Sequence, residues 1–161
     1  MASTSLPSGT STGMSLTDEA IARTHIFALL HRYASLAREE ADYDEITKLF
    51  QSDGIISLEG RQLEPSQLKV ITSVNKPKML RHHITTIDVQ FVSPDEAHCQ
   101  SYIIAGTHMK LPDHWGRWDD VVRRQSDGRW LFQKKTIVSE QVDPEGWLAE
   151  TIALAHQEEK K

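Results

Sequence analysis

The sequence predicts an α+β domain in which N-terminal helices pack into a curved, mainly antiparallel sheet. Two observations lead to this fold class. Apolar residues recur at helical spacing in the first third of the chain, whereas the later part contains long strand-like runs separated by short turns. A chain of 161 residues with 39% hydrophobic and 25% charged residues also has the size and composition of one globular domain.

Two helix starts precede the strands. Ser15 and Asp18 have the spacing of a capping box, and the apolar residues after them predict a long amphipathic helix over about 17–40. A second N-terminal signal at Asp42 predicts a short helix, which is followed by a turn at Asp53-Gly54.

Most of the remaining sequence favours strands. Short strands at 55–58 and 61–63 flank a tight turn at Glu59-Gly60, and Pro65-Ser66 predicts the start of a brief helix over 67–73. Longer runs with short turns between them describe an antiparallel meander over 82–92, 97–109, 116–124 and 130–139.

The two ends of the chain differ in character. The segment 1–14 is rich in Ser and Thr and is predicted to be a disordered leader, which leaves a single domain over 15–161. Asp143-Pro144 predicts a C-terminal helix over 145–157 with one apolar side. Such a helix is suited to cover a pocket.

Charge and cysteine content argue against several classes of protein. A net charge of −5 and a pI near 5.9 provide no basic field for nucleic acid. Cys99 is the only cysteine, so no intramolecular disulfide can form, and we expect this residue to be buried in a strand. No apolar run approaches the length of a membrane span. We therefore expect a cytoplasmic protein that binds neither nucleic acid nor membranes.

Polar residues at the starts of two predicted strands give the strongest indication of a site. Arg81-His82-His83-Ile84 and Gly116-Arg117-Trp118-Asp119-Asp120 place imidazoles and carboxylates where a sheet opens into a pocket. No nucleophile motif or phosphate loop accompanies them, so the pattern favours general acid/base chemistry on a small organic molecule. No metal or other cofactor is expected, because His82, His108 and His114 lack the spacing of a zinc site.

Strand geometry limits how many of these groups can meet. Adjacent residues point to opposite faces, so only one of His82 and His83 can line a pocket, and the same holds for Asp119 and Asp120. Alternation favours His83, because it shares the parity of apolar residues at 87, 89 and 91. A β-bulge would instead bring His82 to the apolar face.

In order and spacing, these motifs resemble the SnoaL-like branch of the nuclear-transport-factor-2-like (NTF2-like) superfamily over roughly 17–139. The resemblance rests on a helix with Tyr33, the Asp53 turn, the strand from His82 to Thr86, the run Gly116-Arg117-Trp118-Asp119-Asp120, and Asp127-Gly128-Arg129-Trp130. It implies a cone-shaped, cystatin-like fold, in which a bent sheet closes around a long helix and leaves a deep apolar pocket. The superfamily includes polyketide cyclases, scytalone-dehydratase-like enzymes, ketosteroid isomerases, limonene-epoxide-hydrolase-like enzymes and small subunits of ring-hydroxylating dioxygenases. Homodimerisation through the open sheet face is also implied.

The resemblance suggests roles for individual residues. His82 matches the histidine that moves a proton in dehydratase-type members. Asp120 falls at the acid of a Gly-Arg-Tyr-x-Asp pattern, with Trp118 in the tyrosine's place, whereas Asp119 fits the dehydratase branch better. Arg38 stands where many members have an aspartate, which favours a cationic group that holds a phenolate, enolate or carboxylate.

The leading hypothesis is a cofactor-independent lyase or isomerase that dehydrates, isomerises or cyclises a polyketide- or terpenoid-like metabolite. The expected proton-transfer groups are His82, Asp120 or Asp119, and His108, and the expected substrate-binding groups are Tyr33, Arg38, Tyr102, Trp115 and Trp118. The absence of the helix aspartate favours an alternative, a non-catalytic ligand-binding or dimerisation module. A third possibility is the small subunit of a ring-hydroxylating oxygenase, which would require a large iron-containing partner.

Overall fold

The structure is a computed structural model that describes residues 12–58, 60–69 and 75–158. Most of the predicted leader at 1–14 lies outside the described residues, as does the end of the helix predicted over 67–73. Within the described ranges, no helix combines the length and apolar character needed to cross a membrane.

The helices begin where local capping places them. Helix α1 (Leu16–Leu36) starts at Ser15, whose hydroxyl accepts a hydrogen bond from the Asp18 amide at 3.1 Å. It ends four residues before the predicted boundary, because Ala37 leaves the helical conformation and its carbonyl instead meets a side chain of the sheet. Other helical segments in the described part of the chain include α2 (Tyr43–Thr47), the 3₁₀ turn η1 (Pro65–Gln67) and α4 (Trp147–Glu158).

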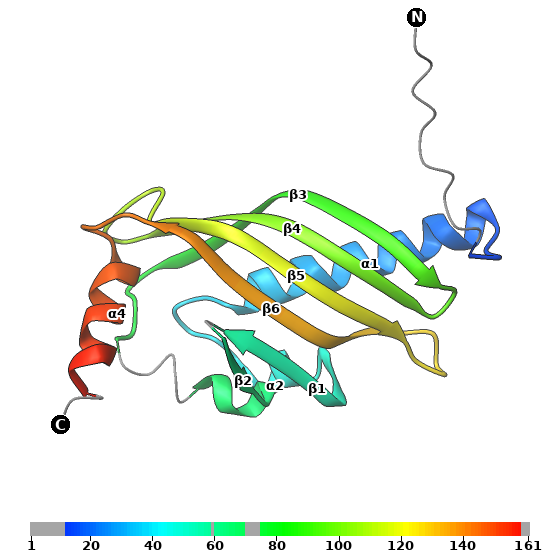
Figure 1. The fold of residues 1–161 in the computed structure, drawn as a ribbon, viewed down its shortest axis with the longest axis horizontal. Coiled ribbons are helices and arrows are strands. Elements are labelled where there is room, and N and C mark those ends of the chain that lie inside the picture. Colours follow the sequence, from blue (N-terminus) through cyan, green and yellow to red (C-terminus); the bar gives the residue numbers. More distant parts are fainter. Residues whose placement is uncertain (1–11, 59, 70–74, 159–161) are drawn as a thin grey trace, which may run out of the picture.

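One six-stranded sheet carries the rest of the fold, in the order β2-β1-β6-β5-β4-β3. Its strands are β1 (Phe50–Leu58), β2 (Arg61–Leu63), β3 (Leu80–Ser93), β4 (Glu96–Thr107), β5 (His114–Arg124) and β6 (Trp130–Val142). The predicted antiparallel meander is confirmed for β3 to β6, whereas β1 pairs with β6 in parallel. In Figure 1, α1 runs alongside the long strands and α4 stands at one end of the sheet.

Two pairing irregularities change which residues face inward. The predicted turn at Asp53-Gly54 is wrong, because both residues belong to β1, whose register with β6 shifts between Phe50 and Ile55. A glycine suits this bulge, since a Cβ on Gly54 would lie 3.0 Å from two backbone oxygens. In β3 the register shifts between Ile84 and Thr86, which confirms that a bulge brings His82 to the same face as the apolar residues further along the strand.

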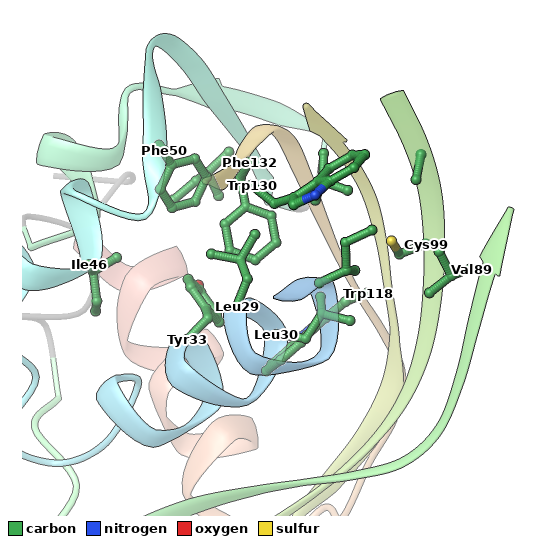
Figure 2. Packing of buried hydrophobic residues seen from close by; sticks show 14 of the residues in the cluster. Leu29, Leu30, Tyr33, Ile46, Phe50, Val89, Cys99, Trp118, Trp130 and Phe132 are labelled. Carbon is green, nitrogen blue, oxygen red and sulfur yellow. The ribbon is translucent and has the colours of Figure 1, made fainter. Parts of the chain in front are cut away.

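The core fills the space between α1 and the concave face of the sheet. Figure 2 shows side chains of α1 meeting aromatic rings from β1, β5 and β6. Cys99 is buried here, as the sequence predicts, and Trp130 is buried beside it in the same cluster. The largest members of this cluster include Leu29, Leu30, Tyr33, Phe50, Trp118, Trp130 and Phe132. Toward the end of the cone where α1 finishes and α4 stands, the packed core gives way to a cavity.

Candidate active site

A mainly apolar cavity of about 430 Å³ opens at this end of the cone. Its walls come from the end of α1, the first residues of β3 and β5, the middle of β6, and α4. Its volume falls in the range typical of small-molecule sites. The apolar and aromatic lining residues include Tyr33, Ile46, Leu58, Leu80, Trp118, Ile137, Trp147 and Leu148. Four residues that the sequence nominated line this cavity, namely Tyr33, Arg38, His82 and Trp118.

His82 presents a neutral imidazole to the cavity. Its Nδ1 lies 2.8 Å from the Ala37 carbonyl oxygen, and because a carbonyl can only accept, this nitrogen must carry the proton. Burial and the neighbouring His114 lower the pKa of His82 to about 4, although the hydrogen bond to Ala37 opposes this change. At neutral pH the ring therefore has a lone pair at Nε2.

A second imidazole, that of His114, stands beside the first. The two ring centroids are 6.0 Å apart, and both rings line the cavity. His114 Nδ1 lies 2.8 Å from Asp113 Oδ1, so that a carboxylate holds this ring as an aspartate–histidine pair. Sequence reasoning missed this pair, because Asp113 and His114 fall in the connection between the strands predicted over 97–109 and 116–124. The sequence feature that could have revealed the pair is the Asp113-His114 dipeptide at the start of β5. In this strand His114, Gly116 and Trp118 alternate onto the inward face.

Asp113 is fully buried, and its carboxylate accepts hydrogen bonds from side-chain and backbone donors. Its oxygens accept from the Thr107 hydroxyl at 2.8 Å and from the backbone amides of Trp147 and Leu148 at 2.6 and 3.2 Å. Burial alone would raise the pKa of this carboxyl, but the donors, including His114, hold it below its usual value. The ionised carboxylate thus caps the first turn of α4 while it orients His114.

The two imidazoles differ in the group that holds Nδ1, which is a carboxylate for His114 and a backbone carbonyl for His82. When an imidazole accepts a proton at Nε2, a carboxylate on Nδ1–H stabilises the positive charge, whereas a carbonyl offers only a dipole. The His82 and His114 rings therefore have different Nδ1 partners, and they meet edge to face at an interplanar angle of 72°. Among the residues that the structure describes, no three His, Cys, Asp or Glu side chains are grouped as metal ligands.

Comparison with known proteins agrees with this architecture. A family model of the SnoaL-like domain matches residues 18–136. The chain belongs to the SnoaL-like family. Comparison with curated proteins gives no match.

Solved structures share the SnoaL-like cone at low sequence identity. LinA superposes with a TM-score of 0.69 and 17% identity over 80% of this chain and 92% of its own. A putative scytalone dehydratase from Novosphingobium aromaticivorans gives a TM-score of 0.65 and 19% identity over 80% and 91% of the two chains. A Nostoc punctiforme protein described as having a cystatin-like fold gives a TM-score of 0.65 and 21% identity over 80% and 96%. These likenesses confirm the predicted cone-shaped fold.

Asp120, a predicted proton-transfer group, faces the interior of the SnoaL-like cone but does not line the cavity. Lys135 Nζ lies 2.9 and 3.2 Å from its two oxygens, and both side chains are fully buried. The same ammonium sits 4.0 Å from the Trp118 ring centroid and 4.3 Å from that of Tyr33. Burial raises the pKa of Asp120 to about 6, against the attraction of Lys135. The residue therefore forms a buried ion pair that lies behind two of the cavity's aromatic rings.

Three other candidates lie on the outer face of the sheet. Asp119 pairs with Arg117 at 3.0 Å, and Tyr102 is 47% exposed. Trp115 stands opposite the exposed Ile104 of β4 and shares its outward face. Strand alternation explains the placement of Trp115 and Asp119. Trp118 points inward, so residues at odd-numbered positions of β5 point to the outer face. The expectation that these side chains line the pocket is corrected.

The second imidazole of the cavity is His114 and not His108. His108 follows the end of β4, is exposed, and accepts a hydrogen bond from the Lys78 amide at 3.3 Å. It is absent from the cavity lining. The chain reverses direction between β4 and β5. His108 lies just after the end of β4, whereas His114 begins β5 and lines the cavity.

The lowered pKa of His82 predicts a pH dependence of stability. As the pH falls below about 6.5, the unfolded chain protonates this histidine, whereas the folded protein resists until about pH 4. Stability is therefore lost across this interval, by about 2 kcal/mol between about pH 7 and pH 4.5. Urea denaturation at both pH values measures the loss, and the His82→Gln variant should lack this component. Equal pH dependences in the two proteins would contradict the prediction.

Proposed function

We propose that this protein is a cofactor-independent lyase or isomerase that moves a proton on a small, flat organic substrate. The observation that carries the proposal is the pair of imidazoles that line a mainly apolar cavity, each with its Nδ1 held by an acceptor. This arrangement leaves both Nε2 atoms as the nitrogens that can exchange a proton with a ligand. Family membership agrees with such chemistry, and one solved structure of the same fold is a hexachlorocyclohexane dehydrochlorinase.

In this proposal His114 is the base. Its Nε2 removes a proton from a substrate carbon, while Asp113 keeps the ring oriented and stabilises the imidazolium that forms. The electron pair of the broken C–H bond forms a double bond, and either a leaving group departs from the adjacent carbon or the charge moves to a carbonyl oxygen. This pair replaces the combination of His82 with Asp119, Asp120 or His108 that the sequence suggested.

His82 and Tyr33 act on the substrate's oxygens. His82 is neutral, so its Nε2 accepts a hydrogen bond from a substrate hydroxyl. Burial and the nearby Asp120 raise the pKa of Tyr33, so its hydroxyl stays protonated and donates to an oxygen on which charge develops.

The walls favour flat ring systems and exclude water. Trp118 of β5 and Trp147 of α4 supply aromatic surfaces to the cavity. Trp147 is fixed by its indole N–H, which donates to the Asn75 carbonyl at 3.0 Å. A polyketide- or terpenoid-like ring compound suits such walls.

A proton-exchange experiment tests the proposal without knowledge of the natural substrate. We expect the protein to accelerate deuterium incorporation at the α-carbon of a bound bicyclic ketone such as 2-tetralone, followed by proton NMR in D₂O. His114→Gln should slow the exchange by about 10²- to 10⁴-fold, because the general base is lost. His108→Gln is the matched control, since it removes an exposed imidazole outside the cavity, and it should exchange at the wild-type rate.

The same experiment separates catalysis from simple binding. A ligand-binding module is the alternative function, and the observation in its favour is that His82 is held by a carbonyl and not by a carboxylate. That alternative predicts that 2-tetralone binds without accelerated exchange and that His114→Gln changes nothing. Either result would remove the proposed catalytic role.

A further inference from the structure

The rim of the cavity carries cations that the proton-transfer proposal does not use. Arg38, Lys69 and Lys76 all line the cavity and are exposed, whereas the apolar wall residues are largely buried. We call these three residues the cationic rim. They stand out because the whole chain has a net charge of −5. Positive charge is thus concentrated at the mouth of an apolar cavity in an acidic protein.

The carboxylates at the same rim do not cancel this charge. Glu39 also lines the cavity, but its carboxylate forms an ion pair with Arg81 and accepts a hydrogen bond from the Leu80 amide at 3.1 Å. The hydrogen bond from Arg81 lowers the pKa of Glu39 to about 2, so this group is ionised and already neutralised. Among the described residues of the lining, Glu40 is the acidic side chain that remains beside the cations Arg38 and Lys76.

Two members of the cationic rim lack an acidic partner. Within the described segments of the chain, neither Arg38 nor Lys76 forms an ion pair. A guanidinium beside an apolar surface is suited to hold a carboxylate through paired N–H donors, and an ammonium adds a point charge. The structure therefore offers cations whose counter-charge a ligand can supply.

The position of Arg38 relates this anion site to the imidazoles. Arg38 directly follows Ala37, the residue whose carbonyl holds His82. The end of α1 thus places a guanidinium at the rim and fixes an imidazole deeper in the cavity. A ligand whose anionic group rests on Arg38 would extend its apolar body toward His82 and His114.

We propose that the substrate is an amphipathic acid, namely an apolar ring compound with a carboxylate that Arg38 and Lys76 hold at the cavity mouth. This inference rests on the proposed function, because it names the substrate class of the same cavity. The carboxylate stays at the solvent-accessible rim, where it keeps part of its hydration, and only the apolar rings enter the cavity. The anchor fixes the depth to which the rings enter and so positions a ring carbon for His114.

Binding of a matched acid and amide tests the inference. We expect anthracene-2-carboxylate to bind at least about tenfold more tightly than anthracene-2-carboxamide, measured by calorimetry, because only the acid pairs with the cationic rim. Raising NaCl from about 20 mM to about 500 mM should shrink this advantage through screening and leave amide binding nearly constant. Arg38→Met should reduce acid affinity by about tenfold, and Lys76→Met by a smaller factor, with amide affinity unchanged.

The control variant is Lys78→Met, which removes a nearby exposed lysine that does not line the cavity and should bind both ligands as the wild type does. Equal affinities for acid and amide would overturn the anion anchor, and so would an acid preference that survives in Arg38→Met combined with Lys76→Met. Absence of binding by both ligands would overturn it as well. These outcomes are distinct from failure of the proposed catalysis, which is judged from the rate of deuterium incorporation into 2-tetralone in the histidine variants.

Discussion

Replacing Lys135 with methionine is expected to destabilise the protein by about 3–5 kcal/mol, a large part of the stability of a domain of this size. The substitution leaves the Asp120 carboxylate buried without its counter-ion, and the charge also loses its 2.9 Å contact with Nζ. Methionine keeps a similar length of apolar side chain against the rings of Tyr33, Trp118 and Phe132, so the measured change reports mainly the electrostatic loss. Urea denaturation at neutral pH provides the measurement.

The paired variant Asp120→Leu with Lys135→Met separates charge from packing. Removing both charges spares the cost of their burial, so the double variant should recover most of the stability lost in the single variant. Lowering the pH should also restore part of the stability of Lys135→Met, because the isolated carboxyl can then take up a proton. A loss below about 1 kcal/mol in the single variant would show that the ion pair contributes little.

Gly116→Ala is expected to cause the second large loss of stability, about 3 kcal/mol or more. A Cβ at this position would lie 2.0 Å from the Val138 carbonyl oxygen and 2.9 Å from the Glu140 amide nitrogen. Both atoms are backbone of β6, so relief requires the β5–β6 pairing to separate next to the register shift at Trp115/Gly116. Because His114 and Trp118 flank this position, the cavity wall should be disturbed as well.

Gly106→Ala is the matched control for this substitution. It also lies in a strand, but its added Cβ would meet Leu111 Cδ1 at 2.6 Å, the end of an exposed and flexible side chain. We therefore expect a loss below about 1 kcal/mol. Thermal unfolding of both variants distinguishes a backbone clash from a general intolerance of alanine, and similar losses in the two would contradict the backbone explanation.

Much of the fold could be predicted because its signals are local. Ser15 and Asp42 begin helices because their side chains accept hydrogen bonds from amides three residues later, so the sequence around them contains the whole cause. The meander of β3 to β6 follows from strand-like runs with short connections. The end of α1 was harder to predict from the sequence, because it depends on the contact of the Ala37 carbonyl with His82 in a distant strand.

The site was predicted only in part because its members are chosen by long-range pairing. His82 faces the cavity through a bulge in β3, which the sequence allowed but did not require. Asp120 meets Lys135 because β5 and β6 pair in that register, and a partner on another strand cannot be identified from the motif around Asp120.

The sequence alone thus determined the class of fold, since this follows from local periodicity and capping, and the order of its motifs resembled the SnoaL-like family. It also predicted an acid/base site near the starts of two strands. The tertiary structure decided which charged groups are structural and which face the cavity. Strand register placed Asp120 beside Lys135 and turned Asp119 outward, and the docking of α4 on Asp113 completed the pair with His114. The physical reason is that burial and pairing set the charge state of an ionisable group, and both arise only when distant segments meet.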